Sequence, residues 1–89
     1  MDFNKLNSEL YQNSAPHRFS KQPGDLDKGY LKIADWLGDL CFYFEQKRKN
    51  QELAYEDEFM EHIEKCRKET SKLPDSEFKK GLLKALSEV

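Results

Sequence analysis

The sequence contains no long hydrophobic run and few cysteines. Its longest unbroken apolar stretch, residues 40–44, is far too short to cross a membrane. The two cysteines, Cys41 and Cys66, are too few for a disulfide framework. The opening segment MDFNKLNSEL lacks the basic and apolar regions of an export signal. We therefore expect a cytoplasmic protein with no membrane contact, in which both cysteines are free thiols.

Net charge is also nearly absent, because 15 lysines and arginines oppose 17 aspartates and glutamates. No field of one sign draws nucleic acid to the chain, so nucleic acid is not an expected partner. The four glycines are scattered, which excludes a glycine-rich loop that cradles a phosphate. Aromatic residues nevertheless make up 12% of the chain, which favours a folded protein over a disordered one. With 89 residues we expect a single domain, 1–89, with a thin core.

Apolar residues recur with helical periodicity in several segments, and no segment has the alternation typical of a strand. The clearest stripe includes Tyr30, Ile33, Leu37 and Phe44. We expect an all-α fold, a small antiparallel helical bundle, because short connections place consecutive helices antiparallel. The expected helices are a short N-terminal one at about 3–11 and three main ones at about 26–49, 52–71 and 75–88.

Two segments between these helices have turn character. Residues 12–24 contain two of the three prolines together with Asn, Ser and Gly, which predicts a loop or a flexible arm. If that arm docks on a partner, His17, Arg18 and Phe19 are its candidate anchors. Residues 47–52 lose the apolar period, so the chain either turns there or continues as one long helix.

The helix expected at 26–49 carries more apolar side chains than one stripe can hold. Trp36, Phe42 and Tyr43 lie outside the stripe. Gly38 costs about 1 kcal/mol relative to alanine in a helix interior, and together with Ala34 it leaves a notch that another helix can approach. We expect Trp36, Gly38, Phe42 and Tyr43 to form an interface, either with a second copy of the chain or with another protein.

Asp35 and Asp39 stand one helical turn apart in this apolar segment, at a spacing that lets two carboxylates share Mg²⁺. Lys32 lies on the same face, so a solvated stripe with local ion pairs is the alternative. His62 and Cys66 also have ligand-like spacing, but Cys66 falls within an apolar stripe and is expected in the core.

The stretch IADWLGDLCFYF resembles the third-helix motif of the all-α nucleoside triphosphate pyrophosphohydrolases of the MazG and phosphoribosyl-ATP diphosphatase type. In that motif an acid, an apolar pair, a small residue and an aspartate precede an apolar run. The likeness covers residues 33–73 and includes FMEHIEKCRKETSKL, which is similar to the next helix of that family. The resemblance implies that Asp35 and Asp39 hold Mg²⁺ against the phosphates of a nucleotide. The Glu-Glu-x-x-Glu helix of the family is missing from residues 1–33.

Two functions are therefore expected as alternatives. The first is a small helical protein that acts through protein–protein interaction, as a homodimer formed through the helix at 26–49, with no cofactor. The second is a reduced or degenerate Mg²⁺-dependent nucleoside triphosphate pyrophosphohydrolase, in which Asp35 and Asp39 are the metal ligands. No catalytic residue is assigned, and the sequence leaves enzymatic activity open while favouring a non-enzymatic role.

Overall fold

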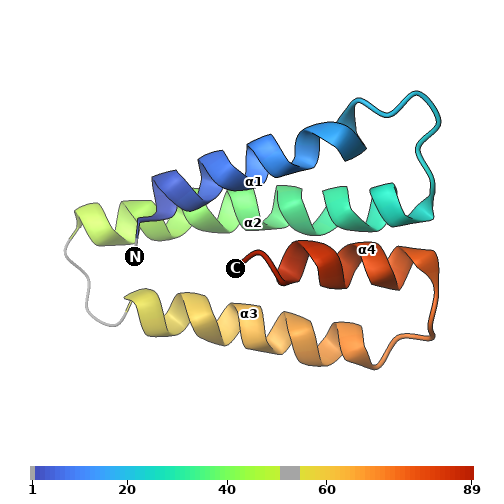
Figure 1. Cartoon of the computed structure of the whole chain (residues 1–89). Helices are drawn as coiled ribbons and strands as arrows, with labels where there is room; N and C mark the ends of the chain where they lie inside the picture. The colour runs from blue at the N-terminus through green and yellow to red at the C-terminus, as the bar shows by residue number, and fades with distance from the viewer. Residues whose placement is uncertain (1, 51–54) are drawn as a thin grey trace.

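The computed structural model describes residues 2–50 and 55–89, and its regular structure in these two ranges is entirely helical (Figure 1). The helices are α1 (Phe3–Arg18), α2 (Asp25–Lys49), α3 (Tyr55–Ser71) and α4 (Glu77–Leu86). This confirms the all-α class that the periodicity predicts. None of the helices in the described ranges combines the length and the apolar character that crossing a membrane requires.

The four helices form a flat layer. Consecutive helices run in opposite directions, and α4 returns between α2 and α3, so that α4 lies parallel to α2 (Figure 1). α2 is the central element, because it packs against each of the other three helices and most extensively against α4 and α1. The Cα atoms span 43 × 28 × 14 Å, so the layer has two broad faces and little depth.

α1 is longer than the sequence predicts. It continues to Arg18, so the predicted helix end at about residue 11 is wrong. The loop predicted at 12–24 is wrong for residues 12–18, which are helical. Pro16 lies inside the last turn, where its missing N–H and its ring disfavour a helix by about 3 kcal/mol. The helix persists because its second half buries one face against the other helices. The buried side chains of this half are Leu10, Ser14 and His17.

α2 agrees with its prediction to within one residue at its start. Gly24 is the N-cap, and its N–H donates to Asp27 Oδ2 at 3.0 Å, which satisfies the backbone at the first turn. The helix ends at Lys49, inside the segment 47–52 where a turn is one of the two expectations. The remainder of that segment and the start of the next helix expected at 52 lie outside the described residues.

The last two helices differ less from expectation. α3 ends at Ser71, as predicted. α4 is shorter than the predicted range 75–88, because Ser76 rather than Asp75 caps it. The Ser76 side chain accepts a hydrogen bond from the Lys79 backbone N–H at 3.1 Å. With 10 residues, α4 and not the N-terminal helix is the shortest of the described helices.

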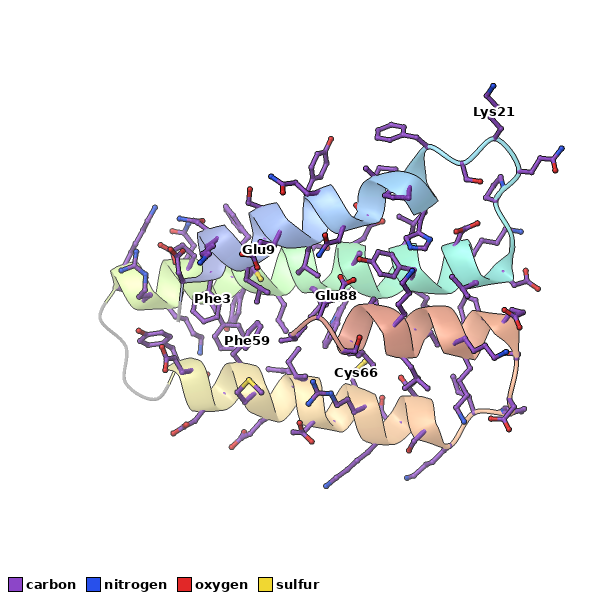
Figure 2. All side chains as sticks on the ribbon, in the orientation of Figure 1. Phe3, Glu9, Lys21, Phe59, Cys66 and Glu88 are labelled. Atoms are coloured by element: carbon purple, nitrogen blue, oxygen red, sulfur yellow. The ribbon has the colours of Figure 1, made fainter. Side chains whose placement is uncertain are left out.

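One part of the core is an aromatic cluster contributed by three helices. Phe3 of α1 and Phe59 of α3 approach one another with ring centroids 5.0 Å apart, and Figure 2 shows the two side chains meeting. Phe44 of α2 lies 5.6 Å from Phe59, in an edge-to-face arrangement. All three rings are fully buried, which stabilises the fold by roughly 1.5–3 kcal/mol for each side chain. The cluster joins α3 to α1 and α2.

The contact between α2 and α4 depends on two glycines. A Cβ atom added to Gly29 would overlap the Phe78 carbonyl oxygen and lie 3.1 Å from the Leu82 amide nitrogen. A Cβ atom added to Gly81 would overlap the carbonyl oxygen of Leu26. The backbones of the two helices are therefore in direct contact, and only glycine fits on either side. The notch that the sequence indicates at Ala34 and Gly38 is a different one, and α4 uses Gly29 instead.

Gly81→Ala should destabilise the protein, because the new methyl group meets backbone atoms that cannot move without separating α2 from α4. Overpacking of this kind costs about 1–3 kcal/mol or more. Gly38→Ala is the matched control. Its Cβ would lie 3.2 Å from Asn7 Oδ1, the end of a flexible side chain, so stability should hold or rise by up to about 1 kcal/mol. Urea unfolding followed by circular dichroism, at a concentration where the chain is monomeric, measures both, and equal stability of the two variants would contradict the role of Gly81.

Candidate functional site

The two aspartates proposed as metal ligands lie exposed on α2. Asp35 Oδ1 accepts a hydrogen bond from Arg18 Nη2 of α1 at 2.7 Å. Asp39, one turn later, has no hydrogen bond or ion pair among the described residues. Within residues 2–50 and 55–89, no group of three or more histidine, cysteine or carboxylate side chains is arranged to hold a metal ion. The positive charge beside Asp35 is thus a guanidinium group, and magnesium binding stays a prediction of the family resemblance.

The four residues expected to form one interface point in different directions. Phe42 and Gly38 line a groove between α1 and α2. Trp36 lines a separate cleft between α2 and α3. Tyr43 is exposed, packs edge-on against Phe44 at 5.2 Å, and lies next to the Lys47 ammonium. Neighbouring helix positions diverge by about 100°, so Phe42 and Tyr43 lie on different sides of α2.

The α1/α2 groove has a floor of small residues and a rim of exposed aromatic side chains. Ser14, Ala34 and Gly38 leave an open hollow of about 450 Å³. Tyr11 and Phe42, at its edge, are 63% and 69% exposed. The sequence reading missed Tyr11, because it ends the first helix at residue 11 and assigns no partner to that position.

The charged side chains of the groove are ordered along it. Arg18 belongs to the C-terminal end of α1, where its ion pair with Asp35 holds it over α2. Asp39 lies one turn further along α2, closer to Phe42. The groove therefore has a cation toward one end and an unpaired carboxylate toward the other. This arrangement of charges favours one orientation of a partner that docks along the groove.

Beneath the C-terminal end of α1 is a polar cluster around the buried side chain of His17. The Nδ1 atom of His17 lies 2.6 Å from Asp27 Oδ1 in α2, and Nε2 lies 3.3 Å from the Lys84 ammonium of α4. A neutral ring with its proton on Nδ1 satisfies both, because it donates to Asp27 and accepts from Lys84. The imidazole also stacks on Tyr30 with centroids 4.1 Å apart. His17 is thus a structural link between three helices, whereas Phe19, the third expected anchor, is exposed.

The polar cluster extends to the C-terminal end of the chain. The Tyr30 hydroxyl donates to Glu88 Oε2 at 2.5 Å. Burial and, after it, this carboxylate raise the pKa of Tyr30, so the phenol stays protonated and remains a donor. Tyr30 is also fully buried and lies under the Lys84 ammonium. The sequence pattern predicts Tyr30 as a core position. It contains no signal that links Tyr30 to Lys84 and Glu88, which lie far along the chain.

The α2/α3 cleft is the second cavity of interest, with a volume of about 360 Å³. Ile33 and Trp36 line it from α2 and Cys66 lines it from α3. Cys66 is partly buried, whereas Cys41 is buried in the core, where burial raises the pKa of its thiol to about 11. The charged residues that line this cleft are Lys32, Lys65 and Glu69, and His62 also lines it.

Asp27→Asn should reduce the loss of stability in acid. The hydrogen bond from His17, and after it the Gly24 N–H, lowers the pKa of Asp27 from its ordinary value of 3.8. Since the pKa is lower in the folded chain than in the unfolded chain, the ionised carboxylate stabilises the fold above the ordinary value. This contribution disappears as the pH falls through the lowered pKa. Urea unfolding between about pH 6 and pH 2 should therefore show a shallower decline for the variant.

The control for this experiment is Asp25→Asn, which removes an exposed carboxylate from the same helical turn and leaves the His17 contact in place. It should keep the decline of the wild type. If Asp27→Asn declines as steeply as the wild type, the bond between His17 and Asp27 does not contribute to the acid sensitivity.

Comparison of the chain with protein-family models, with curated proteins and with solved structures finds no match in any of the three. The resemblance of residues 33–73 to the MazG-type pyrophosphohydrolases therefore rests on the residues quoted above, and the function is argued from the geometry of the grooves.

Proposed function

We propose that this chain acts through protein–protein interaction, as a self-associating helical protein in which a second copy docks on the α1/α2 groove. The observation that carries the proposal is the pairing of exposed aromatic side chains with a small-residue floor on one surface. Phe42 and Tyr11 project at the rim, and Gly38 with its neighbours forms the hollow. Exposed aromatic residues beside a hollow are the usual anchors of a protein interface.

A second copy fits this surface because projection and hollow belong to the same patch. In a two-fold dimer each chain presents the same surface, so that residue i contacts j and residue j contacts i. Phe42 of one chain can then enter the floor near Gly38 of the other, and the reverse contact follows by symmetry. Gly38 and Phe42 are one turn apart on α2, which suits two α2 helices that cross close to this point.

The charges of the groove support an antiparallel arrangement. A two-fold axis across the groove brings the Arg18 end of one chain to the Asp39 end of the other. Asp39 is unpaired among the described residues. The contact of Arg18 with Asp35 involves one guanidinium nitrogen, Nη2. An Arg18 contact with the partner's Asp39 would give the interface an ion pair at each end, which favours one register over others.

The exposed area of the chain also suits association. The chain exposes 6034 Å², whereas a typical monomer of its mass exposes about 5,500 Å². The excess arises from the flat shape, in which the Cα atoms are only 14 Å deep. A stable interface buries about 800 Å² on each partner. Pairing two flat layers through the α1/α2 groove would produce a thicker, more compact particle.

The two cysteines support a cytoplasmic site of action. Both are free thiols, and Cys41 is buried where it cannot pair. Free thiols persist in a reducing compartment, whereas secreted domains of this size generally depend on disulfides. A dimer that relies on side-chain packing rather than on disulfides is the form of association that such a compartment favours.

Phe42→Ser and Tyr11→Ser should each weaken the dimer about thirtyfold or more, because a central aromatic anchor contributes about 2 kcal/mol or more. Sedimentation equilibrium or light scattering coupled to size exclusion measures the effect. At about 100 μM the wild type should be dimeric, provided that the contact contributes more than about −5.5 kcal/mol.

The matched control for this test is Phe19→Ser. Phe19 is 71% exposed, which is as open as Phe42, but it does not line the groove. This variant should dimerise like the wild type. A wild type that stays monomeric at the highest concentration, or a Phe19→Ser variant that dissociates as readily as Phe42→Ser, would contradict the proposal.

A further inference from the structure

The α2/α3 cleft has no role in the proposed dimer, and we infer that it binds a small organic monoanion with a flat apolar body, of the class of aryl carboxylates. This inference does not depend on self-association, since the cleft and the α1/α2 groove share no residue. It rests on the cavity volume, on the apolar walls and on the charges of its lining.

The shape of the cleft follows from how α3 is attached. Near residue 59, α3 packs on α2 through Phe44 and Phe59, whose centroids are 5.6 Å apart. Further along, α4 lies between α2 and α3, and Figure 2 shows Cys66 on the side of α3 that faces α4. Arg67 donates to the Leu86 carbonyl oxygen at 3.2 Å and so holds α3 against the end of α4. The cleft lies further along α3 than the contact between Phe44 and Phe59, and the residues that line it belong to α2 and α3.

The apolar walls suit one aromatic ring. Ile33 and Trp36 come from α2, and the Cys66 thiol comes from α3. The volume of about 360 Å³ lies within the range of small-molecule sites. The partly buried indole of Trp36 offers a flat surface against which a planar group can stack. A single aromatic ring with a short side chain fits within this space.

The charged side chains that line the cleft favour a ligand with a single negative charge. Lys32 from α2 and Lys65 from α3 lie on opposite walls. The Lys32 ammonium lies 5.8 Å from the Phe78 ring, and Lys65 has no ion pair among the described residues. Glu69 adds one negative charge to the lining, so the charged side chains sum to one positive charge. A monoanion is complementary to this lining, while Glu69 repels a second negative charge.

The single tryptophan of the chain makes the test direct, because Trp36 fluorescence reports on this cleft alone. The probe is 3-phenylpropionate, titrated into the full-length protein with excitation at a wavelength that the probe does not absorb. We expect a saturable change in Trp36 emission. The uncharged isostere 3-phenylpropionamide should bind about tenfold more weakly or worse, because it lacks the charge that the lysines attract.

Substitution separates the cleft from general charge effects. Lys65→Met and Lys32→Met should each weaken 3-phenylpropionate binding several-fold. Lys28→Met is the matched control, because it removes the same charge from an exposed position one turn before Lys32 and should leave binding unchanged. Glu69→Gln should strengthen binding, since it removes the repelling carboxylate.

The inference is overturned by the absence of a saturable response in the wild type. It is also overturned if the amide binds as tightly as the acid, if Lys28→Met weakens binding as much as Lys65→Met, or if Glu69→Gln weakens binding. Circular dichroism of each variant checks that the helices are intact, so that a loss of binding is not a loss of fold.

Discussion

The direct contact between the backbones of α2 and α4, made possible by Gly29 and Gly81, determines the architecture of this protein. Because neither glycine has a side chain, α4 lies against α2 at backbone distance and occupies the space between α2 and α3. A side chain at either position would push α4 away. The close approach of α4 to α2 in the layer depends on this contact.

The α1/α2 groove and the α2/α3 cleft lie on different parts of the surface of α2. α4 occupies one side of α2 near its N-terminal half, α1 covers another side, and α3 contacts α2 mainly through the aromatic cluster. The outer surface of α2 is left uncovered between the α1/α2 groove and the α2/α3 cleft. The polar cluster of His17, Asp27 and Lys84 links α1, α2 and α4 across the layer, so α1 keeps its place over the small-residue floor.

Much of the fold is predictable from the sequence, because the apolar stripe of each helix has a single periodicity. Tyr30, Ile33, Leu37 and Phe44 are expected in the core and are buried there. The continuation of α1 past Pro16 is not predictable, since local propensity opposes it and the compensating burial comes from other helices. The pairing of Gly29 with Gly81 is a long-range contact, and one isolated glycine in a helix gives no information about its partner.

The candidate sites, like the fold, are only partly predictable from the sequence. The sequence indicates surplus aromatic residues on α2, but it cannot assign them to two different grooves without knowing where α1 and α3 lie. It also cannot show that Arg18 is the neighbour of Asp35, because that contact depends on the extended α1. Periodicity describes one helix at a time, whereas grooves and ion pairs between helices depend on how the helices are packed.

Association of two copies through the α1/α2 groove can be observed by an isotope-filtered nuclear Overhauser experiment on a mixture of labelled and unlabelled chains. We expect intermolecular contacts between the Phe42 ring protons of one chain and the Gly38 α protons of the other. Intermolecular contacts that involve only α3 or the α2/α3 cleft, or none at all at concentrations where the protein is dimeric, would contradict it.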